Sequence, residues 1–244
     1  MPSLSRTWPR RAVAALMLAI AGALCAAALS SAWSVLPASA SARPEGATVA
    51  QPETKWDPIP YDARRKRQMA NYSHRHYGDR TWRLEDPQAV VLHYTATSTY
   101  PPVFNAFAAN APSLGEAPGT CAQFVVDKDG TIYQLTRLYV RCRHTVGLNH
   151  VAIGVEMVQE ELGTRNGSDQ AILGRLPQVR AAAHLVAWLK TRYGIPMTDV
   201  IGHAMANGSH LFKDLEGWRN DHVDWRPADV RDFRDRVATV IHRG

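Results

Sequence analysis

Two histidines and an aspartate from distant parts of the chain have the residue types of a catalytic zinc site. His93 ends the apolar run Val-Val-Leu-His and His203 ends Val-Ile-Gly-His, so each imidazole stands where a buried strand would reach the surface. Asp224 completes a His/His/Asp set, and Asp221 and His222 remain alternative third ligands. Catalytic zinc takes three such ligands and keeps one position open. A lone histidine at a strand end is more often a core residue, so the prediction of one Zn²⁺ ion depends on the whole set.

Five short motifs follow one another between residues 87 and 242. They are Val-Leu-His-Tyr-Thr-Ala-Thr (91–97), Phe-Val-Val-Asp-Lys-Asp-Gly-Thr-Ile-Tyr-Gln-Leu (124–135), Arg-His-Thr-Val-Gly (143–147), Ala-Ile-Gly-Val-Glu (152–156) and Val-Ile-Gly-His (200–203). In this order and spacing they resemble the zinc-dependent N-acetylmuramoyl-L-alanine amidases, which share a fold with peptidoglycan recognition proteins and amidase-type phage lysozymes. The resemblance covers roughly two thirds of the chain and says nothing about the first 55 residues.

The resemblance assigns roles to the metal-site candidates. His93 and His203 match the two zinc-binding histidines of the family. The third family ligand is an Asp or Cys usually followed by Pro-Gly, with a Lys or similar polar group two residues earlier. Here the segment reads Asn-Asp-His-Val-Asp-Trp-Arg-Pro, in which Asp224 fits best and has His222 two positions upstream.

Two further side chains are predicted to take part in catalysis. Glu156 resembles the catalytic glutamate of the family, and an acid at the end of an apolar strand has a raised pKa that suits a proton shuttle. A salt-bridged strand end is its alternative role. His222 stands where relatives often have Lys, and we expect it to stabilise the oxyanion. Because imidazole is charged only when protonated, activity should fall as pH rises through the His222 pKa.

Other residues are predicted to hold the substrate. His144 resembles a family histidine that lines the groove, and Tyr94 and Thr95 directly follow the first ligand. Asn149 precedes the Glu156 strand and is expected to face the same cleft. Residues 203–222 form a longer segment than in the compact family pattern, either as one wall of the groove or as an inert insertion.

Alternating apolar runs and helical patterns predict the elements that position these side chains. The predicted strands are 89–95, 122–127, 131–135, 151–158 and 200–203, and the predicted helices are 61–72, 177–193 and 227–242. Lys-Asp-Gly joins the second and third strands in a tight hairpin. Strands mixed with crossover helices predict an α/β fold with a central mixed β-sheet and helices packed on it, similar to peptidoglycan recognition proteins.

The N-terminal region has a different composition from the rest of the chain. Residues 1–42 contain three arginines, an Ala/Leu-rich apolar run and small-residue cleavage sites, which indicate a signal peptide, with an uncleaved membrane anchor as the alternative. Residues 43–60 are predicted as a linker, 61–86 as an N-terminal helical arm and 87–244 as the zinc amidase domain. We therefore expect a protein secreted to the cell envelope of a bacterium and tethered to the membrane only if the signal is uncleaved.

Charge and cysteine content narrow the range of partners. Without residues 1–42 the formal charge falls from +6 to +3, because 25 basic and 22 acidic side chains remain. No basic motif with interleaved aromatics is present, so we expect no nucleic acid partner. A basic cluster at 64–67 and 74–76 is either a contact for an anionic wall polymer or a solvated helix face. Cys121 and Cys142, the cysteines outside the signal, are expected to form a structural disulfide.

The function implied by the resemblance is hydrolysis of the amide between N-acetylmuramic acid and L-alanine in peptidoglycan, by a monomer. The residues alone imply only metal-assisted amide hydrolysis. Two alternatives are a peptidoglycan-recognition module that binds without cutting and another zinc peptidase that acts on the stem peptide. Zinc content with an intact Glu156 distinguishes the first alternative, and product analysis distinguishes the second.

Overall fold

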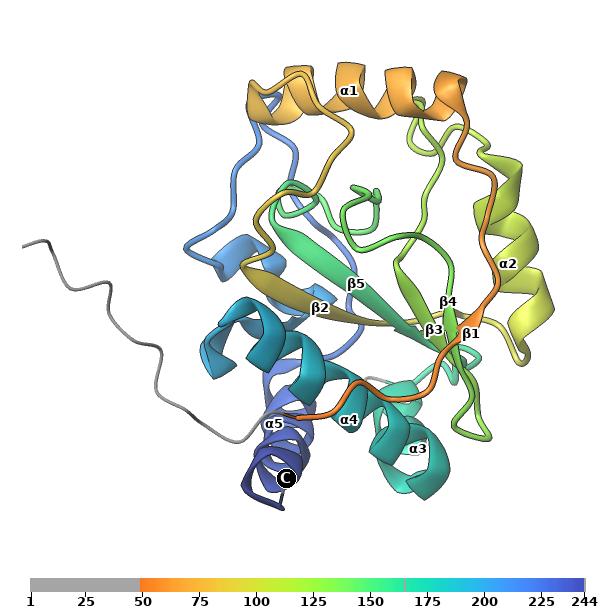
Figure 1. Cartoon of the computed structure of the whole chain (residues 1–244), viewed down its shortest axis with the longest axis vertical. Helices are drawn as coiled ribbons and strands as arrows, with labels where there is room; N and C mark the ends of the chain where they lie inside the picture. The colour runs from red at the N-terminus through yellow and green to blue at the C-terminus, as the bar shows by residue number, and fades with distance from the viewer. Residues whose placement is uncertain (1–48, 165, 244) are drawn as a thin grey trace, which may run out of the picture. The chain divides into compact units, whose positions relative to one another are not determined.

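Six strands form one sheet in the computed structural model, which describes residues 49–164 and 166–243 (Figure 1). The strand order is β1-β4-β3-β5-β2-β6, and only the pair β3 and β4 is antiparallel. The strands are β1 (Lys55–Trp56), β2 (Ala89–Tyr94), β3 (Phe124–Val126), β4 (Ile132–Gln134), β5 (Ala152–Met157) and β6 (Val200–Gly202). The prediction of an α/β fold with a central mixed sheet is confirmed.

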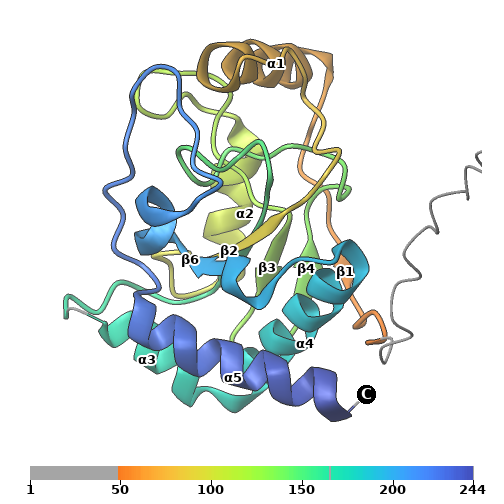
Figure 2. The same cartoon turned by 90° about the vertical axis from the view of Figure 1, so that its left-hand side faces the viewer.

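Helices cover both faces of this sheet. They are α1 (Ala63–Tyr77), α2 (Tyr100–Ala109), α3 (Gly167–Gly174), α4 (Leu176–Tyr193) and α5 (Pro227–Arg243), with short 3-10 helices at Met197–Asp199 and His203–Gly208. Figure 2 shows α3, α4 and α5 on one side of the sheet and α1 on the other. Proline near the start of α4 and Gly194, with a φ of 68°, at its end explain its limits.

The two faces of β2 and β5 are distinguished by alternation along the strand. Val90 and Leu92 of β2 pack in the core with α4 and α5, whereas Ala89 and Val91 belong to a separate cluster on the other face. His93 continues the second set, because successive side chains alternate. In the parallel register of the two strands, His93 lies opposite Glu156 of β5. Strand pairing therefore brings a predicted ligand and the predicted catalytic acid to the same edge.

The N-terminal part of the described chain is more ordered than a linker. Residues 43–60 are predicted as a linker, yet Lys55–Trp56 form β1 and pair in parallel with β4. The helix predicted over 61–72 begins at Ala63, where the Asp62 side chain accepts a hydrogen bond from the Arg65 amide at 2.8 Å, and it ends at Tyr77. Helices α2 and α3 were not predicted. The predicted signal, residues 1–42, lies outside the described residues.

Two further features concern stability and location. Cys121 and Cys142 form a disulfide that closes a loop of 21 residues, which stabilises the fold by roughly 3 kcal/mol on a chain-entropy argument. Among residues 49–164 and 166–243, no helix combines the length and the apolar character needed to cross a bilayer.

Candidate metal centre

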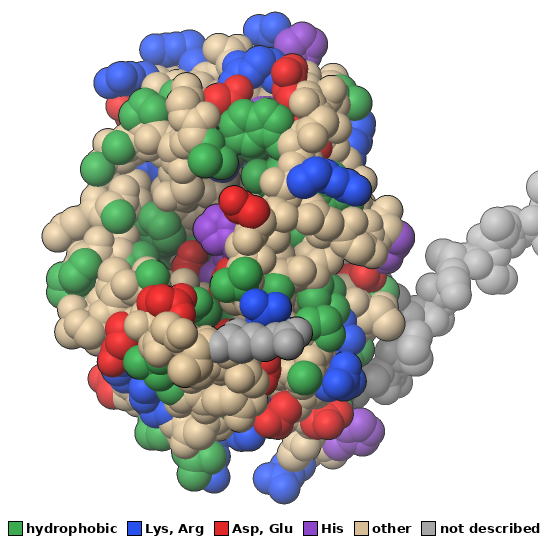
Figure 3. Space-filling view, turned by 180° about the vertical axis from the view of Figure 1, so that it is seen from behind, with side chains coloured by type: hydrophobic (Ala, Val, Ile, Leu, Met, Phe, Trp, Pro, Cys, Tyr) green, Lys and Arg blue, Asp and Glu red, His purple; other side chains and the backbone are tan. Residues whose placement is uncertain are grey.

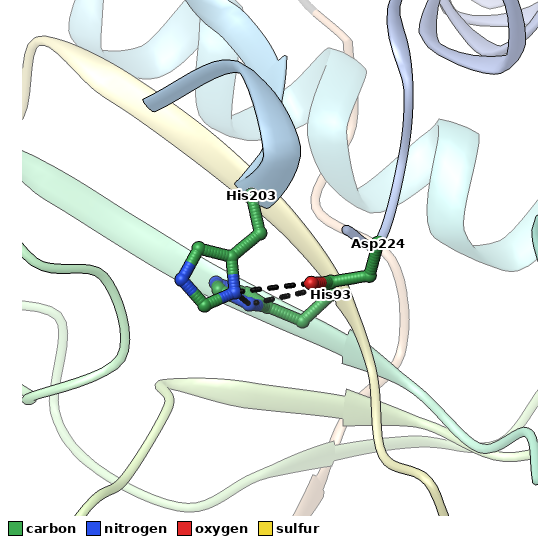
Figure 4. A group of neighbouring side chains, drawn as sticks. All are labelled: His93, His203 and Asp224. Atoms are coloured by element: carbon green, nitrogen blue, oxygen red, sulfur yellow. Dashed lines mark hydrogen bonds and ion pairs between the residues drawn. The ribbon is translucent and has the colours of Figure 1, made fainter. Parts of the chain in front are cut away.

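His93, His203 and Asp224 point toward one another from three different elements (Figure 4). His93 lies on β2, His203 starts the 3-10 helix after β6, and Asp224 lies just before α5. Asp224 carboxylate oxygens lie 3.5 Å from His93 Nδ1 and 3.2 Å from His203 Nδ1, and the two Nδ1 atoms are 3.0 Å apart. All three side chains are buried, and one donor atom from each fits within 4.8 Å of the others. This group could bind a metal ion.

The protonation states of these residues suit a cation. Burial lowers the pKa of His93 to about 4, and the neighbouring His203 acts in the same direction, so the imidazole is neutral and keeps a free lone pair. For Asp224, burial acts to raise the pKa, but the interactions with the neighbouring His203 and His93 outweigh it and hold the carboxyl pKa well below its usual range. Two imidazoles and one carboxylate form a donor set typical of catalytic zinc.

His144 fixes which nitrogen of His93 faces the site. His144 Nε2 lies 3.3 Å from the carbonyl oxygen of Ala152, which can only accept, so this nitrogen carries the hydrogen. Burial lowers the pKa of His144 well below its ordinary value, so its Nδ1 is an acceptor. That Nδ1 lies 3.1 Å from His93 Nε2 and 2.9 Å from Thr145 Oγ1, so it can accept a hydrogen bond from His93. When His93 Nε2 donates this bond, the lone pair of His93 is on Nδ1, the atom that faces the other two ligands.

The position of the His144 side chain depends on two neighbouring residues, Gly154 and Asn149. Gly154 lies beneath the ring, where an added Cβ would stand 2.9 Å from His144 Cγ. Asn149 Oδ1 accepts from the backbone amides of His144 and Thr145 at 2.8 and 2.7 Å. His144 and Asn149 are predicted to hold substrate, and both line a groove beside the ligand group. Both side chains are buried, however, and their hydrogen bonds are made within the protein. Gly154, two residues before Glu156 in the strand motif, is the sequence signal for this packing.

Asp224 is held in place by residues that the sequence did not single out. Asp169 at the start of α3 accepts hydrogen bonds from the amide of Trp225 at 3.0 and 3.1 Å. The carbonyl of Asp224 accepts from the Ala204 amide at 2.9 Å. A Cβ on Gly202 would stand 1.7 Å from the Trp225 carbonyl oxygen, so only glycine allows the two segments to meet. A single sequence does not reveal which distant residues lie close together. Gly202, directly before His203, is the one feature that suggests a close approach of another segment.

Glu156 lies at the end of β5, where it is buried, and its Oε2 has no hydrogen-bond partner among the described residues. Burial raises its pKa from 4.5 to about 8, and the charge of Asp224 adds to this shift. Glu156 lines the same groove as His93, His203 and Asp224, which has a volume of about 630 Å³. An unpaired carboxyl beside a metal-ligand cluster is suited to exchanging a proton with a bound molecule.

His222 and Asp221 lie at the mouth of the groove and outside the ligand group. The His222 ring stacks on His203 with centroids 4.1 Å apart, and its Nδ1 is 3.9 Å from Asp224. The pKa of His222 is lowered, first by burial and then by the neighbouring His203. Its positively charged form is therefore confined to lower pH than for an ordinary histidine. The predicted role of His222 at the oxyanion stays a prediction.

Tyr94 and Thr95 line the groove on the β2 side. The Tyr94 hydroxyl donates to Glu161, and Thr95 Oγ1 accepts from the amides of Thr97 and Gln159, at 3.3 and 3.2 Å. Tyr94 is partly exposed, so its ring remains available to a bound molecule.

The long segment 203–222 forms a wall of the groove, as one of its two predicted roles required. Trp218 and Arg219 of this segment, with Leu114 across from them in a loop after α2, line an extension of about 410 Å³. His76 of α1 ties the walls together, since its ring contacts Asp214 at 2.9 Å and Glu116 at 2.8 Å. Figure 3 shows histidine and acidic side chains gathered at a hollow in the molecular surface.

A family model described as N-acetylmuramoyl-L-alanine amidase matches residues 83–222, a range that contains His93, Glu156 and His203 and ends just before Asp224. No curated protein matches the chain.

Several solved structures are similar to the chain at low identity. The N-acetylmuramoyl-L-alanine amidase LysCS from Clostridium intestinale URNW is 20% identical, with a TM-score of 0.42, and the match covers 64% of this chain and 83% of that one. A mutant endolysin from Bacillus subtilis is 18% identical, with a TM-score of 0.44 and coverage of 76% and 98%. A selenomethionine derivative of AmpD is 16% identical, with a TM-score of 0.47 and coverage of 77% and 98%.

Proposed function

Because the chain belongs to the N-acetylmuramoyl-L-alanine amidase family, we propose that it cuts peptidoglycan with one zinc ion held by His93, His203 and Asp224. The bond cut is the amide that joins the lactyl group of N-acetylmuramic acid to L-alanine of the stem peptide. The observation that carries this proposal is the buried ligand group with the unpaired Glu156 carboxyl in the same groove.

The residues present fit zinc. Three donors of the preferred types meet within 4.8 Å, and the hydrogen bond to His144 orients His93 as metal ligands are commonly oriented. When bound, zinc would supply Lewis acidity to the scissile carbonyl and increase the acidity of water at neutral pH. Burial and, to a smaller extent, the charge of Asp224 raise the Glu156 pKa; a divalent cation beside Asp224 would oppose this rise and make the carboxylate form available.

The chain's own residues handle the protons. Glu156, through Oε2, would take a proton from the attacking water and return it to the amine of L-alanine as that amine leaves. The resulting products are a lactyl carboxylate on the sugar and a free amino terminus on the stem peptide. His222, which lines the groove, would donate a hydrogen bond to the carbonyl oxygen as that oxygen gains charge. We propose that four further residues shape the site. Tyr94 and Thr95 line the groove, whereas His144 contacts the ligand His93 and Asn149 holds the His144 backbone.

The test is hydrolysis of purified peptidoglycan with added zinc, with mass identification of the products. Glu156→Ala and His93→Ala are run beside the parent, and zinc content is measured for each protein. Release of intact stem peptides by the parent and by neither variant is the expected result. Binding to peptidoglycan without release would contradict the catalytic proposal, and cleavage within the stem peptide would contradict the proposed bond.

We also propose that the protein acts outside the cytoplasm as a monomer at the bacterial cell envelope. The support for export is the arginine-flanked apolar run within residues 1–42 and the bridged cysteine pair, which suits an oxidising compartment. Fractionation of expressing cells, with N-terminal sequencing of the mature protein, tests export and cleavage together.

A further inference from the structure

A second groove lies at the opposite edge of the sheet from β6. It has a volume of about 190 Å³ and is lined by residues of β1, α1, the segment between α1 and β2 and the segment after β4, including Trp56, Lys66, Trp82, Arg137 and Tyr139. None of its lining residues belongs to the groove that holds the metal-ligand group. The proposed amidase site therefore does not explain why this second groove is present.

Aromatic rings remain open to solvent in this groove. Trp56 is 43% exposed and Tyr139 is 46% exposed, although a folded chain normally buries most of such rings. Trp82 lies beside Tyr139, with ring centroids 6.3 Å apart in an edge-to-face arrangement. Exposed aromatics gathered in one small groove indicate a binding surface, whereas single exposed rings need no explanation.

Cations accompany these rings. The Arg137 guanidinium lies 4.3 Å from the Trp56 centroid, and Lys66 Nζ lies 4.6 Å from the Trp82 centroid. Arg83 reaches Trp82 and Tyr139 from the rim, where it also contacts Glu85 at 3.5 Å. No acidic side chain lines the groove itself. The groove is therefore complementary to a ligand that has apolar faces and negative charge.

We propose that this groove binds the glycan strand of peptidoglycan after its stem peptides have been removed. The proposal rests on the proposed function, because hydrolysis of the lactyl amide consumes one water and leaves a carboxylate on each muramic acid. The C–H faces of a sugar ring stack on Trp56 and Tyr139, and Lys66 and Arg137 pair with the new carboxylates. Since the strand is a polymer, holding a cleaved portion keeps the metal site near uncut stem peptides and raises their effective concentration.

Binding to stripped glycan strands tests the proposal directly. Strands are prepared by exhaustive digestion with an unrelated amidase, and the affinity of the full-length protein is measured for them and for neutral N-acetylglucosamine oligomers. We expect Trp56→Ala and Tyr139→Ala each to weaken binding to both glycans about fivefold, the effect of losing roughly 1 kcal/mol of aromatic contact. Arg137→Ala should weaken binding of the carboxylate-bearing strand more than that of the neutral oligomer.

A matched control and a second assay separate the possible outcomes. Leu176→Ala removes a side chain that is 50% exposed and lies outside this groove, and it should bind the strands as the parent does. Cleavage of a small soluble muramyl peptide should be equal in the parent and in all four variants. Equal strand binding by the parent and Trp56→Ala, or no strand binding by the parent, would overturn the inference. Strand binding that depends on Trp56, without cleavage of the soluble peptide, would support the groove while contradicting the proposed amidase activity.

Discussion

Replacement of Glu156 by Gln should stabilise the metal-free protein at alkaline pH while it abolishes hydrolysis. Because the pKa of Glu156 is about 8 in the folded protein against an ordinary 4.5, the folded state binds a proton that the unfolded state has lost between these values. The stability of the parent therefore falls as pH rises from about 4.5 through 8 and levels off above that. Gln keeps the shape of the side chain and cannot ionise, so this loss is absent from the variant.

The size of the effect follows from the two pKa values. Their difference corresponds to at most about 5 kcal/mol, and relaxation around the charged carboxylate makes a few kcal/mol the realistic expectation. Any hydrogen-bonding defect of the Gln amide adds a constant offset that does not change with pH. The diagnostic quantity is therefore the change with pH in the stability difference between the two proteins.

Urea unfolding of parent and Glu156→Gln after chelation, at pH 5 and at pH 9, measures this quantity. We expect the free energy of unfolding of the variant, relative to that of the parent, to rise by roughly 2 to 5 kcal/mol from pH 5 to pH 9. Zinc added in excess at pH 9 should narrow the gap, because a nearby cation compensates the carboxylate. A stability difference that is the same at both pH values would refute the argument that Glu156 is desolvated.

Three other perturbations have defined outcomes. His144→Ala should weaken zinc binding about 10- to 100-fold in a chelator competition, and His144→Gln, which can accept and donate at the same positions, should restore part of it; unchanged affinity in His144→Ala would contradict the orienting role. Gly202→Ala should destabilise the fold by at least about 1 to 3 kcal/mol and reduce bound zinc, because its Cβ would overlap the Trp225 carbonyl, and a thermal melt with metal analysis checks both. Replacing Cys121 and Cys142 together by Ser should lower stability by roughly 3 kcal/mol in urea titrations, and an unchanged midpoint would show that the bridge constrains little.

The sequence allowed the central parts of the site to be predicted because their positions follow from strand geometry. His93, Glu156 and His203 each end an apolar run, and parallel strands bring their carboxyl ends to one edge of the sheet. The supporting contacts could not be predicted in this way. Asp169 meets Trp225 across 56 positions, and that contact depends on the path of two loops.

The N-terminal region shows a second limit of sequence reasoning. β1 has only two residues, too few for any alternation of apolar and polar side chains to be visible. The basic run at the start of α1 was interpreted as one cluster, yet Arg65 is buried and donates to the carbonyl of Phe107 at 2.7 Å, while Lys66 lies against Trp82. Adjacent residues of like charge face different environments on a helix, which composition alone does not reveal.

The hydrogen bond from the Ala204 amide to the Asp224 carbonyl closes the segment between them into a loop with fixed ends. Those ends lie at the second and third proposed ligands, so residues 205–220, which do not include His222, should be able to change in length and sequence without moving either ligand. We therefore expect changes in residues 205–220 to alter the groove wall and leave the proposed ligands in place. Exchanging residues 205–220 for the shorter loop of another family member should change substrate preference while the metal site stays intact.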